Sequence, residues 1–231
     1  MAIVARVTTF DAILFDAGGI FVLPDPTVLR PLLVPYGASA ELGDYVRAHY
    51  RAMAVKSATG AMEGTWHDYD RAFVECVGVP AQDVEFAADI LGLTRHAPLW
   101  RWPIVESVAA LASLAASGMP LGVVSNASGQ VEDVLRRVGV CQVGPGAYTS
   151  VRVIVDSHVV GVAKPDPRIF DFALPHFEDC DRSRIAYVGD SVTMDIGGAR
   201  AGGLYPILLD PYDDHSGADF HRIGSLTDLL E

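Results

Sequence analysis

Cysteine is scarce in this sequence of 231 residues, and none of it lies in a Cys-x-x-Cys pair. The three cysteines are Cys76, Cys141 and Cys180. Their odd number and wide spacing argue against a disulfide framework and against a zinc site. Cysteine usage of this kind is typical of a reducing compartment.

Long uncharged apolar runs are also absent. Nowhere do about 18 apolar residues follow one another, the length that a transmembrane helix needs. Near the start of the chain, Arg6, Asp11 and Asp16 interrupt the apolar stretch that a signal peptide requires. We therefore expect a cytoplasmic protein.

Positive charge is in short supply, since 17 Lys and Arg face 29 Asp and Glu and give a net charge of −12. No local basic patch offsets this balance. Such a chain repels phosphate backbones and anionic lipids, so we expect neither a nucleic-acid partner nor a membrane partner. The expected partner is a small molecule, and the expected assembly is a monomer or a homodimer.

Four short apolar runs each end in small or polar residues, as buried parallel strands do. They cover residues 12–15, 121–124, 185–188 and 206–209. Helical patterns lie between them at 105–117, 129–138, 167–174 and 191–202. This alternation predicts an α/β fold with an open parallel sheet.

One block interrupts the alternation. From about residue 24 to residue 95 only helical patterns occur, at 41–54, 65–77 and 81–91, and prolines mark both ends of the block. A block this long between two strands is more than a simple crossover. We predict a core formed by residues 1–22 and 98–231 and a helical domain inserted at 23–97.

Polar residues gather where the predicted strands end: Asp16, Ser125, Asn126 and Asp190, with Lys164 on a nearby loop. In an open α/β sheet, ligands bind beyond the carboxyl ends of the strands. Each residue also has a structural interpretation, because aspartates cap turns and Ser-Asn caps a helix. Their convergence at one edge favours a binding or catalytic site.

Four motifs occur in order along the chain. They are Phe15-Asp16-Ala17-Gly18-Gly19-Ile20, Val124-Ser125-Asn126, Lys164-Pro165-Asp166-Pro167 and Gly189-Asp190-Ser191-Val192-Thr193-Met194-Asp195. Together they resemble the haloacid dehalogenase superfamily, in particular the members with a helical cap inserted after the first motif. The resemblance covers nearly the whole chain and implies a Rossmann-like core beside an all-helical cap.

The resemblance also implies a role for each motif residue. Asp16 would be the nucleophile that forms an aspartyl intermediate, and Lys164 would neutralise charge beside it. The implied phosphate-binding residues are Ser125, Asn126, Gly18 and Gly19. The implied ligands of a Mg²⁺ cofactor are Asp16, Gly18, Asp190 and Asp195. The implied activity is Mg²⁺-dependent hydrolysis of a small phosphorylated metabolite.

One position departs from the family's phosphatases, which usually carry Asp-x-Asp where this chain has Gly18. The missing carboxyl is the general acid–base group, whose loss typically costs about 10²- to 10⁴-fold in rate. Haloacid dehalogenase, phosphonatase and non-catalytic small-molecule binder therefore stay open as alternatives. Dehalogenases of the family need no metal, whereas this chain keeps the metal-type fourth motif.

Several further residues have an ordinary structural interpretation. Lys56 could serve a phosphonatase as the cap lysine, but a solvated helix lysine is the favoured interpretation. The segment 66–70, which begins with Trp66, could face the cleft and recognise the substrate, but packing is the favoured interpretation. Trp100 is expected to pack at the exit of the cap. An acidic segment is expected to be a solvated loop and not a metal cluster. Its polar residues are Asp210, Asp213, Asp214, His215 and Asp219.

Overall fold

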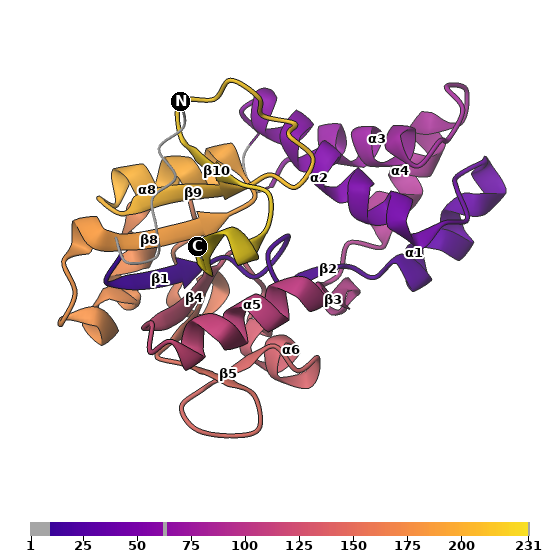
Figure 1. Ribbon diagram of the computed structural model, residues 1–231. Coiled ribbons are helices and arrows are strands. Elements are labelled where there is room, and N and C mark those ends of the chain that lie inside the picture. The colour runs from indigo at the N-terminus through magenta and orange to yellow at the C-terminus, as the bar shows by residue number, and fades with distance from the viewer. Residues whose placement is uncertain (1–9, 62–63, 231) are drawn as a thin grey trace.

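The computed structural model describes residues 10–61 and 64–230, and its centre is a six-stranded sheet (Figure 1). The strand order is β10-β9-β8-β1-β4-β7, and every neighbouring pair is parallel. The strands are β1 (Ala12–Phe15), β4 (Leu121–Ser125), β7 (Ile154–Asp156), β8 (Ile185–Gly189), β9 (Tyr205–Leu209) and β10 (His221–Ile223). The predicted parallel α/β fold is confirmed.

The four apolar runs of the sequence all become strands of this sheet. Every residue of β1, β4 and β8 is buried. Strands covered on both faces consist of continuous apolar residues, which explains why these runs show no alternation. Strands β7 and β10 were not expected from the sequence, because with three residues each they are too short to leave a pattern.

The register aligns the carboxyl ends of the central strands. Phe15 of β1 lies opposite Val123 of β4 on one side and opposite Val188 of β8 on the other. The residues that follow these three strands therefore emerge at the same edge of the sheet, and the polar side chains singled out from the sequence follow them.

Helices and turns cover both faces of the sheet. On one face α5 (Val105–Ala116), α6 (Val131–Arg137) and η8 (Leu226–Leu230) contribute to one apolar cluster. On the other face η4 (Pro167–Phe172), η5 (Leu174–Phe177) and α8 (Gly197–Ala201) contribute to a second. The remaining elements of this part are α7 (Ser157–Val160), η6 (Arg182–Arg184) and a two-stranded parallel sheet of β5 (Cys141–Val143) and β6 (Thr149–Val151).

Two predicted helices of this part are only partly correct. The pattern at 167–174 forms the 3₁₀ turns η4 and η5 in place of an α-helix. The pattern at 191–202 begins as a π-helical turn, η7 (Val192–Ile196), before α8. The π turn lies directly after β8 at the polar edge, a place where such turns are frequently functional.

Between β2 (Val22–Pro24) and β3 (Trp100–Pro103) the residues that the structure describes form four α-helices around an apolar cluster of their own. They are α1 (Pro26–Leu33), α2 (Leu42–Ala58), α3 (His67–Cys76) and α4 (Val84–Leu93), with the 3₁₀ turns η2 (Val34–Tyr36) and η3 (Ala97–Leu99). We call the described residues between β2 and β3 the helical insert. Its limits as a domain, 23–97, stay a prediction.

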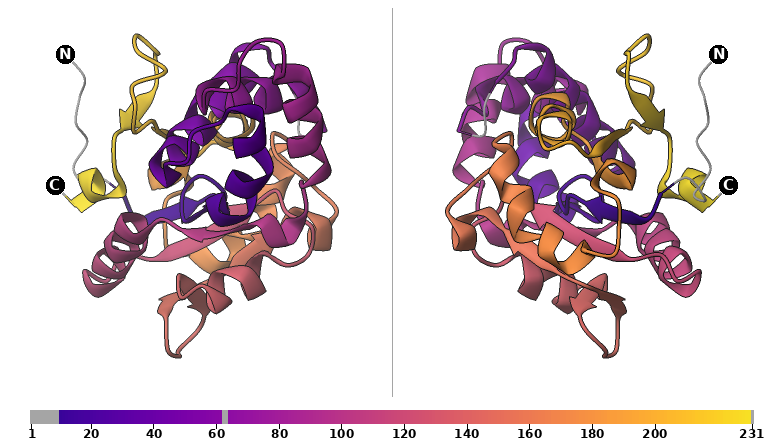
Figure 2. Two further views of the ribbon diagram at one scale, coloured as in Figure 1. Left: turned by 90° about the vertical axis from the view of Figure 1, so that its right-hand side faces the viewer. Right: turned by 90° about the vertical axis from the view of Figure 1, so that its left-hand side faces the viewer.

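The helical insert covers one end of the sheet and neither of its faces. It lies beyond the antiparallel pair β2–β3, in front of the sheet in one view of Figure 2 and behind it in the other. Helix α1 was missed because its prolines suggested a loop. Pro26 occupies the first helical turn, which tolerates proline, and the Asp25 side chain accepts a hydrogen bond from the Thr27 backbone N–H. None of the described helices is long and apolar enough to cross a membrane.

The middle strand of the sheet gives a direct test of this core. Leu14 is fully buried, and its Cδ2 lies 2.8 Å from the point where a Cβ on Gly122 would stand. We expect Leu14→Ala to lower the free energy of unfolding by about 2–5 kcal/mol, because the substitution removes buried methyl groups and leaves a cavity in the core. Urea unfolding measures it.

Leu93→Ala is the control, because Leu93 is 76% exposed on the last turn of α4. It should change the free energy of unfolding by no more than about 0.5 kcal/mol. Equal effects of the two substitutions would contradict the description of the core.

Candidate active site

Four charged residues of the predicted site meet at the polar edge of the sheet. Asp16 follows β1, Asp190 follows β8, Asp195 lies in η7, and Lys164 lies in the loop before η4. Oxygen atoms of the three carboxylates lie within 4.8 Å of one another. The Lys164 Nζ lies 3.0 Å from Asp16 Oδ1 and 2.7 Å from Asp195 Oδ1. The structure therefore brings all four together.

The Lys164 loop is held in place by Asn126. The Asn126 side chain accepts a hydrogen bond from the Lys164 backbone N–H at 2.8 Å and donates to the Lys164 carbonyl at 3.0 Å. Asn126 was predicted as a phosphate-binding residue, but these two bonds use its carboxamide to position the lysine. The residue after β4 thus sets where the Lys164 amine lies.

Lys164 is fully enclosed by partners. Its Nζ donates to the Tyr187 hydroxyl at 2.7 Å as well as to the two aspartates. Burial alone would lower the pKa of Lys164, but the charges of Asp16 and Asp195 outweigh it and raise the pKa above its usual range. The lysine is therefore a permanent cation. Tyr187 was not singled out from the sequence as a site residue, because it lies within the apolar run 185–188 that predicts a buried strand.

The surroundings of the Asp16 carboxyl disfavour its ionised form. Burial raises its pKa to about 7, with Asp195 and Asp190 acting in the same direction and Lys164 opposing them. Its Oδ1 accepts hydrogen bonds from the Ala17 N–H at 2.8 Å and from Lys164. Three carboxylates around one lysine leave an excess of negative charge.

This excess and the donor chemistry fit a hard divalent cation. Mg²⁺ prefers oxygen ligands, and carboxylates that lie this close together repel one another unless a cation binds them. Asp16, Asp190 and Asp195 all line the cavity of the site. The Asp195 oxygens already accept from Lys164 and from the Ser191 N–H, the latter at 2.9 Å, so Asp195 lies behind the other two.

A histidine of the helical insert reaches this cluster. His49 of α2 is 1% exposed, and its Nε2 lies 2.9 Å from Asp190 Oδ2 while its Nδ1 lies 2.9 Å from the Tyr69 hydroxyl. Sequence reasoning missed His49, because a histidine inside an amphipathic helix belongs to none of the four motifs. Only the packing of α2 against the sheet edge shows its role.

The two glycines after Asp16 serve different purposes. Gly19 has φ +69°, and a Cβ on it would lie 1.9 Å from Asp190 Oδ2, so only glycine lets Asp190 approach the backbone there. Its carbonyl accepts from the Tyr50 hydroxyl at 2.7 Å. Gly19 was expected to bind phosphate, but it is not among the residues that line the cavity of the site.

Gly18 lies against an aromatic ring. A Cβ on Gly18 would stand 3.0 Å from Cζ3 and 3.3 Å from Cε3 of Trp100, the first residue of β3. Trp100 in turn makes edge contacts with the rings of His49 and Trp66. A Cβ at position 18 would therefore require the indole to shift by a few tenths of an ångström.

A cavity of about 280 Å³ connects the sheet edge with the helical insert. The predicted site residues that line it are Asp16, Gly18, Ser125, Asn126, Lys164, Asp190 and Asp195. From the insert and β3 it is lined by Met53, Lys56, Trp66, Arg95, His96 and Trp100. A cavity at the low end of the range for small-molecule sites suits a small ligand.

One structural interpretation made from the sequence is wrong here, and two others are incomplete. Lys56 is 3% exposed and lines the cavity, so it is no solvated helix lysine. Trp66 and Trp100 line the cavity as well as packing. The burial of Lys56 escaped the sequence because its place on α2 is set by α3 and the segment after α4.

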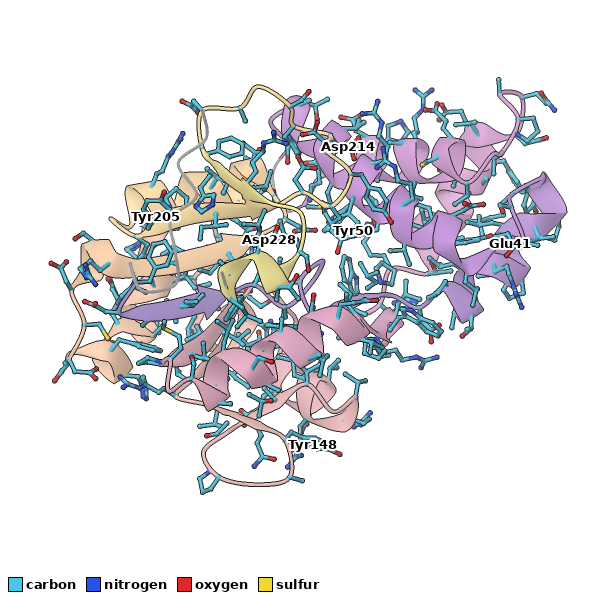
Figure 3. The ribbon with its side chains drawn as sticks, in the orientation of Figure 1. Glu41, Tyr50, Tyr148, Tyr205, Asp214 and Asp228 are labelled. Carbon is cyan, nitrogen blue, oxygen red and sulfur yellow. The ribbon has the colours of Figure 1, made fainter. Side chains whose placement is uncertain are left out.

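The acidic segment 210–219 is also not uniformly solvated. Asp210 is buried and accepts hydrogen bonds from the backbone N–H groups of Asp214 and His215, at 2.9 and 3.0 Å. Asp214 forms a two-point ion pair with Arg47 of α2, and Figure 3 labels Asp214 where the segment after β9 passes this helix. The ion pair joins the helical insert to the segment after β9. The predicted absence of a metal cluster in this segment stays a prediction.

The chain matches the haloacid dehalogenase-like hydrolase family over residues 10–203 and belongs to it. Bovine haloacid dehalogenase-like hydrolase domain-containing protein 3 is 35% identical over 136 residues, 56% of this chain and 51% of the relative. Phosphoserine phosphatase of Thermus thermophilus is 30% identical over 166 residues, which are 70% of this chain and 62% of the relative. The chain spans about half to two thirds of the length of these curated relatives.

Solved structures show the same fold. A HAD phosphatase from Thermococcus onnurineus has a TM-score of 0.57 at 21% identity, with 95% of both chains covered. The putative HAD-hydrolase YfnB from Bacillus subtilis, solved bound to magnesium, has a TM-score of 0.59 at 16% identity, with 97% of both chains covered. Family membership, predicted from the sequence, is confirmed.

The unfavourable ionisation of Asp16 is measurable without activity. With chelator present, we expect Asp16→Asn to raise the melting temperature at pH 8, because it removes a carboxylate whose pKa is raised from 3.8 to about 7. The native state then binds more protons than the unfolded state between these values, so ionisation destabilises the fold fully above about pH 7. The gain should shrink as the pH falls to 5.

Asp219→Asn is the control, since that side chain is 84% exposed. Its effect on the melting temperature should vary little over the same pH range. A gain for Asp16→Asn that grows toward pH 5 would contradict the raised pKa.

Proposed function

We propose that the chain is a Mg²⁺-dependent phosphatase that hydrolyses a small phosphorylated metabolite through an aspartyl-phosphate on Asp16. The observation that carries the proposal is the Lys164 amine, which lies within 3.0 Å of Asp16 and 2.7 Å of Asp195 in a cavity that a small ligand can fill. A nucleophilic carboxylate beside a fixed cation suits attack on a phosphoryl group, whose reaction needs positioning and charge neutralisation.

The first half-reaction follows from the hydrogen bonds of Asp16. Oδ1 accepts a hydrogen bond from the Ala17 N–H and pairs with Lys164. We therefore assign the attack on phosphorus to Oδ2. The bond from Oδ2 to phosphorus forms, the bond from phosphorus to the ester oxygen breaks, and that oxygen leaves with a proton taken from water. Lys164 and the Ser125 hydroxyl lie beside the transferred group.

The second half-reaction restores the enzyme. A water molecule attacks the phosphorus of the aspartyl-phosphate, the bond from Oδ2 to phosphorus breaks, and inorganic phosphate leaves. Asp16 and Asp190, with the Gly18 carbonyl and Asp195 behind them, would hold Mg²⁺. When bound, Mg²⁺ supplies positive charge for the phosphoryl oxygens.

The names of relatives support a phosphate ester as the substrate class. The chain is similar to a phosphoserine phosphatase and, over a shorter stretch, to a pyrimidine 5'-nucleotidase. Dehalogenases share the fold, but Asp190 and Asp195 at the cavity favour the metal-dependent reaction. The phosphonatase alternative gains one observation, because Lys56 lines the cavity. A cytoplasmic location, a monomer or homodimer and no nucleic-acid partner stay predictions.

Hydrolysis of p-nitrophenyl phosphate tests the proposal. The aryl leaving group needs little protonation, so the absent acid at Gly18 does not mask activity. We expect turnover that requires Mg²⁺, stops with chelator and falls at least about 10³-fold in Asp16→Asn, as expected when a nucleophile is removed. Turnover that survives in Asp16→Asn would contradict the proposal, and circular dichroism would show that the variant is folded.

The contact between Gly18 and Trp100 predicts the effect of restoring the missing acid. We expect Gly18→Asp to lower kcat/KM at least about 10-fold, because its Cβ would stand 3.0 Å from the indole and its carboxyl group would need further room, and small misplacements in a site have large effects. Gly18→Ala, which adds only the Cβ, should lower it less.

The same substitution in a Trp100→Ala background separates crowding from chemistry. There Gly18→Asp should be less harmful than in the native background, which a double-mutant cycle on kcat/KM measures. A rise in activity for the single Gly18→Asp variant would contradict the crowding argument.

A further inference from the structure

A buried chain of hydrogen bonds runs from the helical insert to the candidate active site. His49 of α2 is 1% exposed, and its Nε2 lies 2.9 Å from Oδ2 of Asp190, which is itself buried. The other ring nitrogen, Nδ1, lies 2.9 Å from the Tyr69 hydroxyl of α3. Three buried polar groups therefore connect two helices of the insert with the edge of the sheet.

The hydrogen bonds of this chain have a defined direction. Burial raises the pKa of Tyr69 above its usual range, so its hydroxyl keeps its proton. Within the part of the chain that the structure describes, this hydroxyl has no hydrogen-bond partner besides His49, so it donates to Nδ1. An imidazole that accepts at Nδ1 carries its proton on Nε2. The Nε2–H of His49 therefore donates to Asp190.

Packing alone does not explain a histidine at this place. The imidazole makes edge contacts with the rings of Tyr50 and Trp100, which an apolar ring would make as well. Burying two polar nitrogens costs free energy unless both are hydrogen-bonded, and both are. The polar atoms of His49 therefore act on Asp190 and add nothing to the apolar core of the insert.

Helix α2 restrains the surroundings of Asp190 at two more points. Tyr50, the residue after the histidine, donates to the Gly19 carbonyl at 2.7 Å. The Ser57 hydroxyl accepts from the Val192 backbone N–H at 3.2 Å. A Cβ on Gly19 would lie 1.9 Å from Asp190 Oδ2, so the Gly19 backbone and the imidazole enclose this oxygen together.

The two carboxylate oxygens of Asp190 therefore have different surroundings. Oδ2 accepts from His49. Oδ1 accepts no hydrogen bond from residues 10–61 and 64–230, and Asp190 lines the cavity. The oxygen that the hydrogen bonds leave for a cation is Oδ1.

We propose that His49 is a positioning residue of the cation site: its Nε2–H holds Oδ2 of Asp190, so that Oδ1 is presented to Mg²⁺. The inference rests on the proposed phosphatase function and deepens it, because it makes cation binding depend on the helical insert. Hydrogen bonds to a ligating carboxylate fix its orientation, and their loss typically weakens metal binding by about 10- to 100-fold. Since binding free energies are reciprocal, the bound cation also stabilises the insert in its place.

Cation binding to the whole chain tests the proposal without requiring turnover. Mn²⁺ is the probe, because it shares the preference of Mg²⁺ for oxygen ligands and the free ion gives an electron paramagnetic resonance signal. We expect His49→Phe, which keeps a ring and removes both nitrogens, to raise the dissociation constant about 10-fold or more. His49→Gln should stay within about threefold of the native chain, because its amide can donate to Asp190 and accept from Tyr69.

His67→Phe is the matched control, since the His67 side chain on α3 is 66% exposed and does not line the cavity. It should leave the dissociation constant unchanged. Binding by His49→Phe that is as tight as native binding, or tighter, would overturn the proposal. An equal loss in His49→Phe and His49→Gln would also overturn it, because that result would reflect packing and not the hydrogen bond.

His49→Phe leaves the Tyr69 hydroxyl without an acceptor, so circular dichroism accompanies each variant. If the single variant fails to fold, His49→Phe combined with Tyr69→Phe removes the stranded hydroxyl and should show the same rise in the dissociation constant. Mn²⁺ binding that Asp190→Asn does not weaken overturns the positioning role. Aryl phosphate turnover reports on the phosphatase function separately, and binding that depends on His49 without turnover supports the positioning role and refutes the phosphatase.

Discussion

The candidate site depends on the neutralisation of one buried lysine. The Lys164 amine has its charge balanced by Asp16 and Asp195 and its third proton accepted by Tyr187. These partners come from β1, from η7 and from β8, and Asn126 after β4 holds the lysine's backbone. Because a buried charge is tolerated only when its partners are in place, the aligned strand ends and the lysine loop stabilise one arrangement together.

The helical insert completes this arrangement from the opposite side. His49 contacts Asp190, Tyr50 donates to the Gly19 carbonyl, and Arg47 pairs with Asp214, so α2 contacts the core at three points. The cavity is what remains between these contacts. Its sheet side carries the reactive carboxylates, and its insert side carries cations and aromatic rings.

The glycine that departs from the usual phosphatase pattern has a physical explanation. A Cβ at position 18 would stand 3.0 Å from the Trp100 ring, and this ring packs against His49 and Trp66. Replacing Gly18 alone therefore disturbs the aromatic cluster that shapes the cavity. The departure belongs to a set of residues on β3 and the helical insert, so it cannot be understood as the loss of a single group.

Local patterns were enough to predict the parallel sheet, because each buried strand is a continuous apolar run. They were also enough to predict that the residues at or near the strand ends meet at one edge: Asp16, Ser125, Lys164, Asp190 and Asp195. The sequence by itself missed α1, the π turn of η7 and the short strands, whose signals are weak or resemble loops. It also misjudged Lys56, Asp210 and Asp214 and overlooked His49. Whether such side chains are buried, and which residues they contact, depends on elements distant in the chain. These properties therefore become visible only when the chain is folded.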